Sequence, residues 1–169
     1  MTAGLVPGKS DSAANSVSAS ELVSVLAERG ETVAAAESLT AGLVCATLTD
    51  VPGSSAVVRG GLVVYATDLK ARLAGVDPRL LAEHGAVHPD VAAQLAAGAR
   101  EVCGADWGLG LTGVAGPDPQ DGVEPGTVHI ALAGAGVRLV RSHRFEGDRG
   151  AVRAASVRAA LELLRSRLD

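Results

Sequence analysis

Aromatic residues are nearly absent from this sequence of 169 residues, which contains one Phe, one Trp and one Tyr. Aromatics make up 2% of the chain and hydrophobic residues 47%, so the interior must be built from aliphatic side chains. No apolar run reaches the length of a membrane span, and the N-terminus lacks the charged start and apolar stretch of a secretion signal. We therefore expect a folded globular protein of the cytoplasm with no membrane partner.

Positive charge and cysteine are also scarce. The net charge is -4 and the pI is about 5.5, whereas nucleic-acid binding requires clustered cationic surface. We expect a small-molecule substrate and no nucleic acid. Cys45 and Cys103 have neither metal-like nor redox-like spacing, so we expect small buried hydrophobes in a reducing compartment, with no metal site and no cofactor.

The length suits one domain. Residues 1–17 are rich in Gly, Ser and Ala without periodicity, which predicts a flexible tail, and the domain is expected over residues 18–169. Periodicity and turn residues predict an α/β fold, a single-domain α/β/α sandwich with a mixed sheet covered by helices. Helices are expected over residues 18–30, 68–73, 78–84, 89–103 and 149–168, and a further helix is expected to follow residues 37–42 and to end near residue 50. Strands are expected over residues 32–36, 57–66, 106–112, 126–133 and 137–145.

Three short motifs are misleading. Residues 8–10 resemble the end of a phosphate-binding loop but lack its first glycine and a preceding strand. The glycines of residues 108–113 match a dinucleotide fingerprint by letter, yet they fall inside an expected strand. His84 and His88 have the spacing of helical zinc ligands, but Gly85 and Pro89 make one continuous helix improbable, and structural or surface roles are favoured.

Three other segments stand where an expected strand gives way to a loop or helix, namely residues 36–42, 65–70 and 112–118. In open α/β sheets ligands bind at such strand ends, where helix N-termini offer unpaired N–H groups to anions. We expect the three segments to share one pocket.

A nucleophile and a base can be assigned to these segments. Ser38 lies at a strand-to-helix turn, where nearby backbone N–H groups can form an oxyanion hole; the alternative is a helix cap, which serine forms more often. Thirteen of the fifteen basic residues are arginine, which stays protonated, and Lys70 is the only lysine outside the expected tail. Burial or a neighbouring cation can lower a lysine pKa far enough for it to act as a base; the alternative is a solvated helix face.

Three more residues have both a functional and a structural interpretation. Tyr65, the only tyrosine, can position the Ser–Lys pair or stack on a base ring, or it can be partial core. Thr112 can hydrogen-bond the nucleophile or a phosphate, or simply form a turn. Arg149, at the start of the last helix, can bind a phosphate bidentately or remain an ordinary surface arginine.

Nine short motifs occur in order along the chain. They are Ala36-Glu37-Ser38-x-Thr40-x-Gly42, Val51-Pro52-Gly53-Ser54-Ser55, Arg59-Gly60-Gly61, Tyr65 with Lys70, Gly75-Val76, His84-Gly85-Ala86-Val87, Thr112-Gly113-x-Ala115-Gly116-Pro117, Gly126-Thr127-Val128 and Gly147-Asp148-Arg149. Together, over about residues 18 to 168, they resemble the CinA C-terminal family.

This resemblance implies a nicotinamide mononucleotide deamidase, a Ser/Lys amidohydrolase that releases nicotinic acid mononucleotide and ammonia without a metal. It further implies a homo-oligomer. The alternative function is a nucleotide-binding CinA-like protein without turnover, associated with competence or damage. Carried onto this chain, the resemblance makes Ser38 the nucleophile and Lys70 the base, supported by Tyr65 and Thr112, with substrate contacts at Thr40, Gly42, Gly113, Gly116 and Arg149.

The chain departs from the family pattern at three places, one of which is Ala66-Thr67 after Tyr65, where the family usually has Ser-Asn. The family usually has Ser-Cys-Thr-Gly-Gly where this chain has Leu39 and Ala41 within residues 38–42, and Ala41 adds a methyl group where backbone and ligand approach closely. The loop of residues 118–125 usually carries a Lys-Pro pair but here contains three acidic residues, which exchange positive for negative charge beside a phosphorylated substrate.

Overall fold

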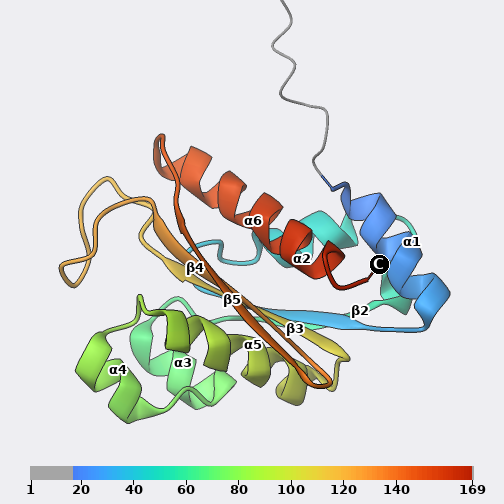
Figure 1. Cartoon of the computed structure of the whole chain (residues 1–169), viewed down its shortest axis with the longest axis horizontal. Coiled ribbons are helices and arrows are strands. Elements are labelled where there is room, and N and C mark those ends of the chain that lie inside the picture. The colour runs from blue at the N-terminus through green and yellow to red at the C-terminus, as the bar shows by residue number, and fades with distance from the viewer. Residues whose placement is uncertain (1–16, 169) are drawn as a thin grey trace, which may run out of the picture.

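The computed structural model of the chain describes residues 17–168, so the expected tail lies outside the described residues except for Val17, which packs partly against the core. The fold is a single α/β domain in which helices cover both faces of a five-stranded mixed sheet, as the sequence predicts (Figure 1). Its elements are α1 (Ala19–Arg29), β1 (Val33–Glu37), α2 (Leu43–Thr49), a 3-10 turn η1 (Ser54–Ala56), β2 (Val58–Val63), α3 (Thr67–Ala74), α4 (Pro78–His84), α5 (Pro89–Cys103), β3 (Trp107–Gly113), β4 (Thr127–Gly134), β5 (Val137–Arg144) and α6 (Arg149–Arg165).

Local chemistry sets most helix ends. The side chain of Ser18 accepts a hydrogen bond from the N–H of Glu21 at 3.2 Å, and the Glu21 carboxylate accepts one from the N–H of Ser18 at 3.0 Å, which confirms the predicted capping box of α1. Gly30 ends the helix in the left-handed conformation. Pro78 and Pro89 occupy the first turns of α4 and α5, where their missing N–H groups leave no hydrogen bond unmade.

The sheet order is β2-β1-β3-β4-β5, with β1 parallel to both β2 and β3, and with β4 and β5 added antiparallel. The central strand β1 is buried on both faces, as its continuous apolar sequence predicts. Val33 and Ala35 face a core cluster shared with α1, α2 and α6, whereas Ala34 and Ala36 face a second cluster shared with α3, α4 and α5. Figure 1 shows these two helical layers above and below the sheet.

Glycines in β3 allow α5 to lie unusually close to the sheet. A Cβ atom at Gly108 would meet the carbonyl oxygen of Ala96 at 2.0 Å, and one at Gly110 would meet that of Ala92 at 2.3 Å. These contacts explain the fingerprint-like glycines of residues 108–113 as packing residues inside a strand, in agreement with the rejection of a dinucleotide motif.

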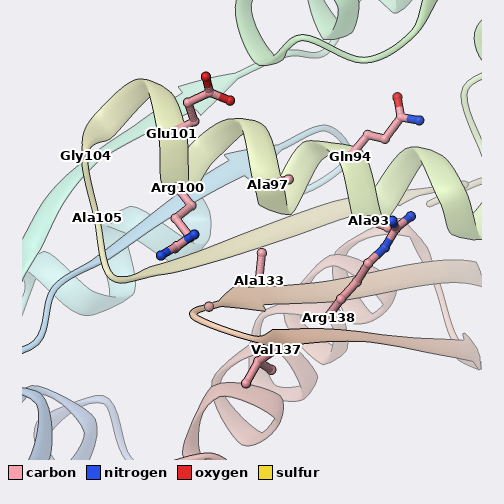
Figure 2. A pocket seen from close by; sticks show the side chains of 11 residues that line it. Ala93, Gln94, Ala97, Arg100, Glu101, Gly104, Ala105, Ala133, Val137 and Arg138 are labelled. Atoms are coloured by element: carbon pink, nitrogen blue, oxygen red, sulfur yellow. The ribbon is translucent and has the colours of Figure 1, made fainter.

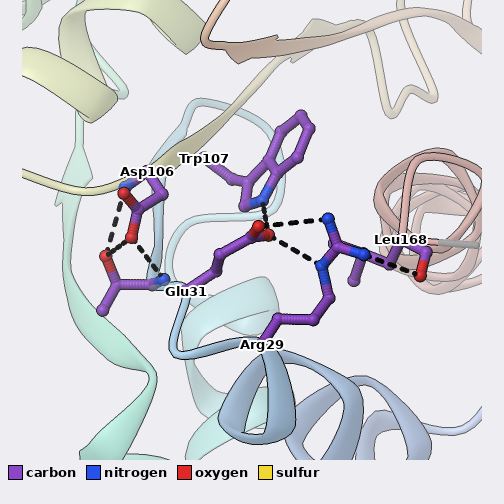
Figure 3. Close-up of polar contacts among 6 residues, drawn as sticks. Arg29, Glu31, Asp106, Trp107 and Leu168 are labelled. Atoms are coloured by element: carbon purple, nitrogen blue, oxygen red, sulfur yellow. Dashed lines mark hydrogen bonds and ion pairs between the residues drawn. The ribbon is translucent and has the colours of Figure 1, made fainter.

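A polar network closes the end of the sheet where β1 and β3 begin (Figure 3). The indole N–H of Trp107 donates to Glu31 at 2.7 Å, and Arg29 donates to the same carboxylate at 3.1 Å from two nitrogens. The Arg29 and Trp107 donors lower the pKa of Glu31. Asp106 accepts two 2.8 Å hydrogen bonds from Thr32. This end of the sheet is therefore held by structural contacts, while the opposite end carries the candidate site.

Candidate functional site

The candidate site lies where the three parallel strands β1, β2 and β3 end, at one edge of the sheet. A cavity of about 270 Å³ opens there. All three segments expected to share a pocket contribute to its wall. The wall consists of Ser38 and Leu39, residues 65–67, Ala86 and Val87, residues 112–116, Asp118, Gln120 and Arg149.

Ser38 is the first residue after β1. Its N–H donates to the carbonyl of Leu111 in β3 at 3.1 Å, which anchors the turn to the sheet, and the residue is 8% exposed. The carbonyl of Ser38 accepts from the N–H of Ala41 at 3.1 Å, so the chain reverses tightly before α2. Ala41 adopts φ 47, a left-handed conformation that glycine tolerates better than alanine. Its side chain is exposed, so the added methyl group points to solvent and does not fill the cavity.

Glu37, the last residue of β1, fixes the position of α2. Its side chain is 1% exposed, and its two carboxylate oxygens accept hydrogen bonds from the N–H groups of Val44 at 2.8 Å and Cys45 at 3.2 Å. A carboxylate at a helix N-terminus also interacts favourably with the helix dipole. Glu37 thereby joins the end of the strand to the start of the helix on either side of Ser38. An acidic residue before a short helix is the only sign of this role in the sequence, and it is too common to predict it.

Lys70, in α3, is 1% exposed, so the solvated-helix interpretation is wrong. Its amino group donates to the carbonyls of Val64 at 2.9 Å and Tyr65 at 3.1 Å. No carboxylate of residues 17–168 lies within ion-pair distance of it. Burial lowers the pKa of Lys70 from 10.5 to about 8. Lys70 does not line the cavity itself but is hydrogen-bonded to Tyr65, which does.

Arg149 and Tyr65 form one wall of the cavity. Arg149 donates from Nη1 to the carbonyl of Gly116 at 2.8 Å and from Nη2 to the hydroxyl of Tyr65 at 3.0 Å. Tyr65 is 57% exposed and is therefore not a core residue. Thr112 is 1% exposed and donates to the carbonyl of Ala86 at 2.7 Å, which leaves its oxygen lone pairs as acceptors.

The remaining expected substrate contacts divide into two groups. Gly113 and Gly116 line the cavity. Thr40 and Gly42 do not: Gly42 precedes α2 as its N-cap, and Thr40 is fully buried. The hydroxyl of Thr40 has no hydrogen-bond partner among the residues that the structure describes.

Two features of this edge were missed or only partly predicted. Arg153 binds the carbonyls of Leu39 and Thr40; its spacing of four residues from Arg149 on a helix was the available signal. Asp118 lines the cavity, so part of the acidic loop does reach the site.

A larger cavity, of about 550 Å³, lies at the far end of the sheet between α5 and the β4–β5 hairpin (Figure 2). Arginine side chains at Arg100 and Arg138 border a floor of small residues. No serine, threonine, tyrosine or lysine occurs among the described residues that line it. Its described lining therefore offers no hydroxyl nucleophile and no lysine base, and we assign the candidate site to the smaller cavity.

Several other expectations can be compared with the structure. Cys45 and Cys103 are free but only partly buried. His84 ends α4 and His88 caps α5, so they do not share a helix, and their rings stack with centroids 4.5 Å apart. Within residues 17–168, no three His, Cys, Asp or Glu side chains are placed to hold a metal ion. None of the helices over the same residues has the length and apolarity needed to cross a membrane.

Comparisons with known proteins agree with this architecture. The chain is 50% identical over 147 residues to a CinA-like protein of Frankia casuarinae, covering 87% of this chain and 34% of that protein. It is 51% identical over 142 residues to a CinA-like protein of Geobacter sulfurreducens, and the match covers 83% of this chain and 34% of that protein. The chain thus spans about a third of the length of these relatives.

Solved structures give the same result. The competence/damage inducible protein CihA of Agrobacterium tumefaciens superposes with a TM-score of 0.85 at 36% identity, covering 88% of this chain and 92% of that one. A competence-damaged protein (CinA) superfamily protein of Enterobacter cloacae superposes with a TM-score of 0.85 at 29% identity, and the match covers 100% of this chain and 99% of that one. The family described as the CinA C-terminal domain matches residues 15–168. The chain therefore belongs to the CinA C-terminal domain family.

Proposed function

We propose that this protein is a nicotinamide mononucleotide deamidase that hydrolyses the substrate carboxamide through a Ser38–Lys70 pair. The observation that carries the proposal is the state of Lys70. Its amine is buried without an ionic partner, its pKa is lowered to about 8, and it is hydrogen-bonded to a residue of the cavity that Ser38 lines. Perturbed lysines in such positions are typical of catalytic bases.

The hydrogen bonds of Lys70 suit a base. A neutral amine has two N–H groups and one lone pair, and the two carbonyls of Val64 and Tyr65 take both N–H groups. The lone pair is left to accept a proton. With a pKa near 8, about a tenth of the lysine is neutral at pH 7.

The proposed reaction proceeds in two stages. Lys70 takes the proton of the Ser38 hydroxyl as the oxygen attacks the amide carbon, and the protonated lysine then gives that proton to the departing nitrogen, which leaves as ammonia. Lys70, neutral again, then takes a proton from water as the water oxygen attacks the ester carbon, and it gives that proton to the departing Ser38 oxygen, which releases nicotinic acid mononucleotide and the free serine. Both stages require the side-chain oxygen of Ser38 and the amine of Lys70 to come within hydrogen-bond reach of each other.

Arg149 supports recognition of the nucleotide phosphate. Arg149 lines the cavity and is the first residue of α6, whose N-terminus is already capped by the Asp148 carboxylate, so the guanidinium is the group that would bind the phosphate. Its bond to the hydroxyl of Tyr65 holds the guanidinium in place before a ligand arrives. Thr112 donates its only proton to the carbonyl of Ala86, so its hydroxyl can accept a hydrogen bond from Ser38 or the substrate but cannot donate one to a phosphate.

The test is ammonia release from nicotinamide mononucleotide by the purified full chain, with nicotinic acid mononucleotide measured by chromatography. Ser38→Ala is the matched control, because it removes one oxygen atom from a loop and leaves the core intact. We expect stoichiometric ammonia and acid from the parent and none from Ser38→Ala. Equal ammonia from both proteins would reject Ser38 as the nucleophile.

A nucleotide-binding protein without turnover is the second candidate function. The departure of residues 118–125 from the family pattern favours it, because Asp118 and Gln120 of this loop line the cavity and so change the residues beside the substrate. Retained binding of the mononucleotide by calorimetry, together with no ammonia above the Ser38→Ala background, would select this function.

The proposal includes a cytoplasmic homo-oligomer. Free Cys45 and Cys103 accord with a reducing compartment. Strand β2 is an edge strand, and Val63 within it is 49% exposed beside Tyr65 at 57%. Exposed apolar side chains along an unpaired strand edge support self-association there.

A further inference from the structure

Arg153 forms hydrogen bonds to the loop that follows Ser38. It lies one turn after Arg149 on α6 and is partly buried. Its Nε donates to the carbonyl of Leu39 at 2.9 Å and its Nη2 to the carbonyl of Thr40 at 3.3 Å. One guanidinium therefore fixes two consecutive peptide groups from the side of α6.

The carbonyls and the N–H groups of this loop are paired very differently. The carbonyl of Ser38 accepts from Ala41, and that of Thr40 also accepts from Leu43 at 3.1 Å, so with Arg153 all three carbonyls of residues 38–40 have donors. By contrast, the backbone N–H groups of Leu39 and Thr40 find no acceptor within residues 17–168.

These unpaired N–H groups are buried, since Leu39 is 4% exposed and Thr40 0%. Buried backbone N–H groups without acceptors are rare and call for an explanation. The hydroxyl of Thr40 is buried without a partner as well. Three unpaired donors thus occur within the two residues after Ser38, and Leu39 lines the cavity.

The orientation of one of these donors follows from Arg153. The peptide between Leu39 and Thr40 is trans, because the one cis bond of the described chain joins Gly116 to Pro117. In a trans peptide the carbonyl and the N–H point in opposite directions. With the carbonyl of Leu39 held toward α6, the N–H of Thr40 is directed away from α6.

We propose that the N–H of Leu39, a residue of the cavity wall, is an oxyanion donor of this site and that Arg153 positions the loop that carries it. The inference rests on the proposed function, because it supplies a donor for the tetrahedral intermediate formed on Ser38. The N–H after a nucleophile is a recurrent oxyanion donor in hydrolases with a strand-to-helix serine. Arg153 touches the loop and not the substrate, so its effect is on the geometry of that donor.

Arginine suits this role better than lysine. A planar guanidinium presents several N–H groups in fixed directions and can hold two carbonyls at once, whereas an ammonium is a single point charge. Arg153→Lys therefore retains the charge and loses the double contact. Arg153→Met removes both and keeps an unbranched side chain. Arg158 on the same helix is exposed, so Arg158→Met is a matched control for the loss of one arginine.

The first arm of the experiment measures kcat and KM for ammonia release from nicotinamide mononucleotide. Loss of one oxyanion donor lowers kcat by about 100- to 1,000-fold in hydrolases. Arg153→Met misplaces the donor without deleting it, so we expect kcat to fall at least about tenfold, with KM changed less than about threefold. Arg153→Lys should fall in between, and Arg158→Met should match the parent.

The second arm does not depend on the nucleotide. A fluorophosphonate ester reacts with an activated serine and leaves a phosphoryl oxygen in the oxyanion position, and intact mass gives the rate of adduct formation at Ser38. We expect Arg153→Met to slow this rate by a factor similar to that on kcat. In the 15N-labelled parent, the amide proton of Leu39 should move downfield in the adduct, and this measurement needs no variant to fold.

The outcomes separate the two proposals. If the parent releases no ammonia but is phosphonylated at Ser38, the proposed deamidase activity is rejected. The comparison of phosphonylation rates between the parent and Arg153→Met still tests the proposed oxyanion hole in that case. Equal phosphonylation rates in parent and Arg153→Met, an unmoved amide resonance of Leu39, or no adduct at Ser38 in the parent would each overturn the inference.

Discussion

The buried amine of Lys70 makes the stability of the fold depend on pH in a direction opposite to that of most ion-paired lysines. Its pKa is lowered from 10.5 to about 8 by burial, so the folded protein binds the proton more weakly than the unfolded chain does. Between these two values the unfolded state carries more protons, and stability therefore rises with pH. The penalty is fully present below pH 8 and is relieved as the pH approaches 10.5.

The size of the effect follows from the shift. One pKa unit corresponds to about 1.4 kcal/mol, so the full penalty is about 3 kcal/mol for this 1%-exposed side chain. Between pH 7 and pH 10, Lys70 loses its proton first in the folded and then in the unfolded state, and these two titrations together remove about 2.5 kcal/mol of the burial penalty.

The assay is urea unfolding of the parent and of Lys70→Met at pH 7 and pH 10, under reducing conditions. The methionine keeps an unbranched apolar stem and removes the amine, and other groups that titrate in this window contribute equally to both proteins. The free energy of unfolding of the parent should rise by about 2.5 kcal/mol relative to the variant. A difference below about 0.5 kcal/mol, or one of opposite sign, would refute the argument that burial holds this amine partly neutral.

Four further predictions concern the site and its surroundings. Lys70→Arg should lower turnover at least about 100-fold relative to the parent, because a guanidinium cannot act as a base. The rate of the parent should rise with pH to a plateau above the Lys70 pKa of about 8, and a near-normal turnover of the variant with an unchanged pH profile would remove Lys70 from the mechanism. Arg149→Ala should weaken binding of nicotinamide mononucleotide in calorimetry by more than that of the dephosphorylated nucleoside, and equal losses would exclude a phosphate contact. Ala41→Gly should raise the free energy of unfolding in urea by up to about 1 kcal/mol, because residue 41 has φ 47. Ala46→Gly, inside α2, should lower it by about as much, and a change of the same sign in both variants would contradict the strain argument. Val63→Lys should reduce the mass measured by light scattering if β2 is the contact between copies, and an unchanged oligomer would place that contact elsewhere.

Features set by neighbouring residues could be predicted from the sequence. The capping box at Ser18, the prolines that begin α4 and α5, and the apolar run of β1 each act over a few residues, so their helices and strand begin where expected. The convergence of Ser38, Tyr65 and Thr112 on one cavity was also predictable, because each lies at or just after the carboxyl end of a strand, and these strand ends meet at the same side of the sheet.

What could not be predicted depends on residues far apart in the chain. The burial of Lys70 arises only when α3 packs beneath the sheet edge, and its sequence neighbours Asp68 and Arg72 suggest a surface position. The bonds of Arg153 to Leu39 and Thr40 join segments more than a hundred residues apart. No local pattern encodes such contacts, because they are consequences of the sheet order and of where α6 crosses it.

The contacts of α6 also set the order in which the site can be completed during protein synthesis. Leu39 is translated 114 residues before Arg153, which binds its carbonyl. At about 5 to 20 residues per second, the loop after Ser38 waits about 6 to 23 seconds for the side chain that holds it. A nascent chain can thus carry Ser38, Lys70 and most of the sheet while one wall of the cavity is still inside the ribosome. The loop after Ser38 is held in place only once the chain has been made as far as Arg153.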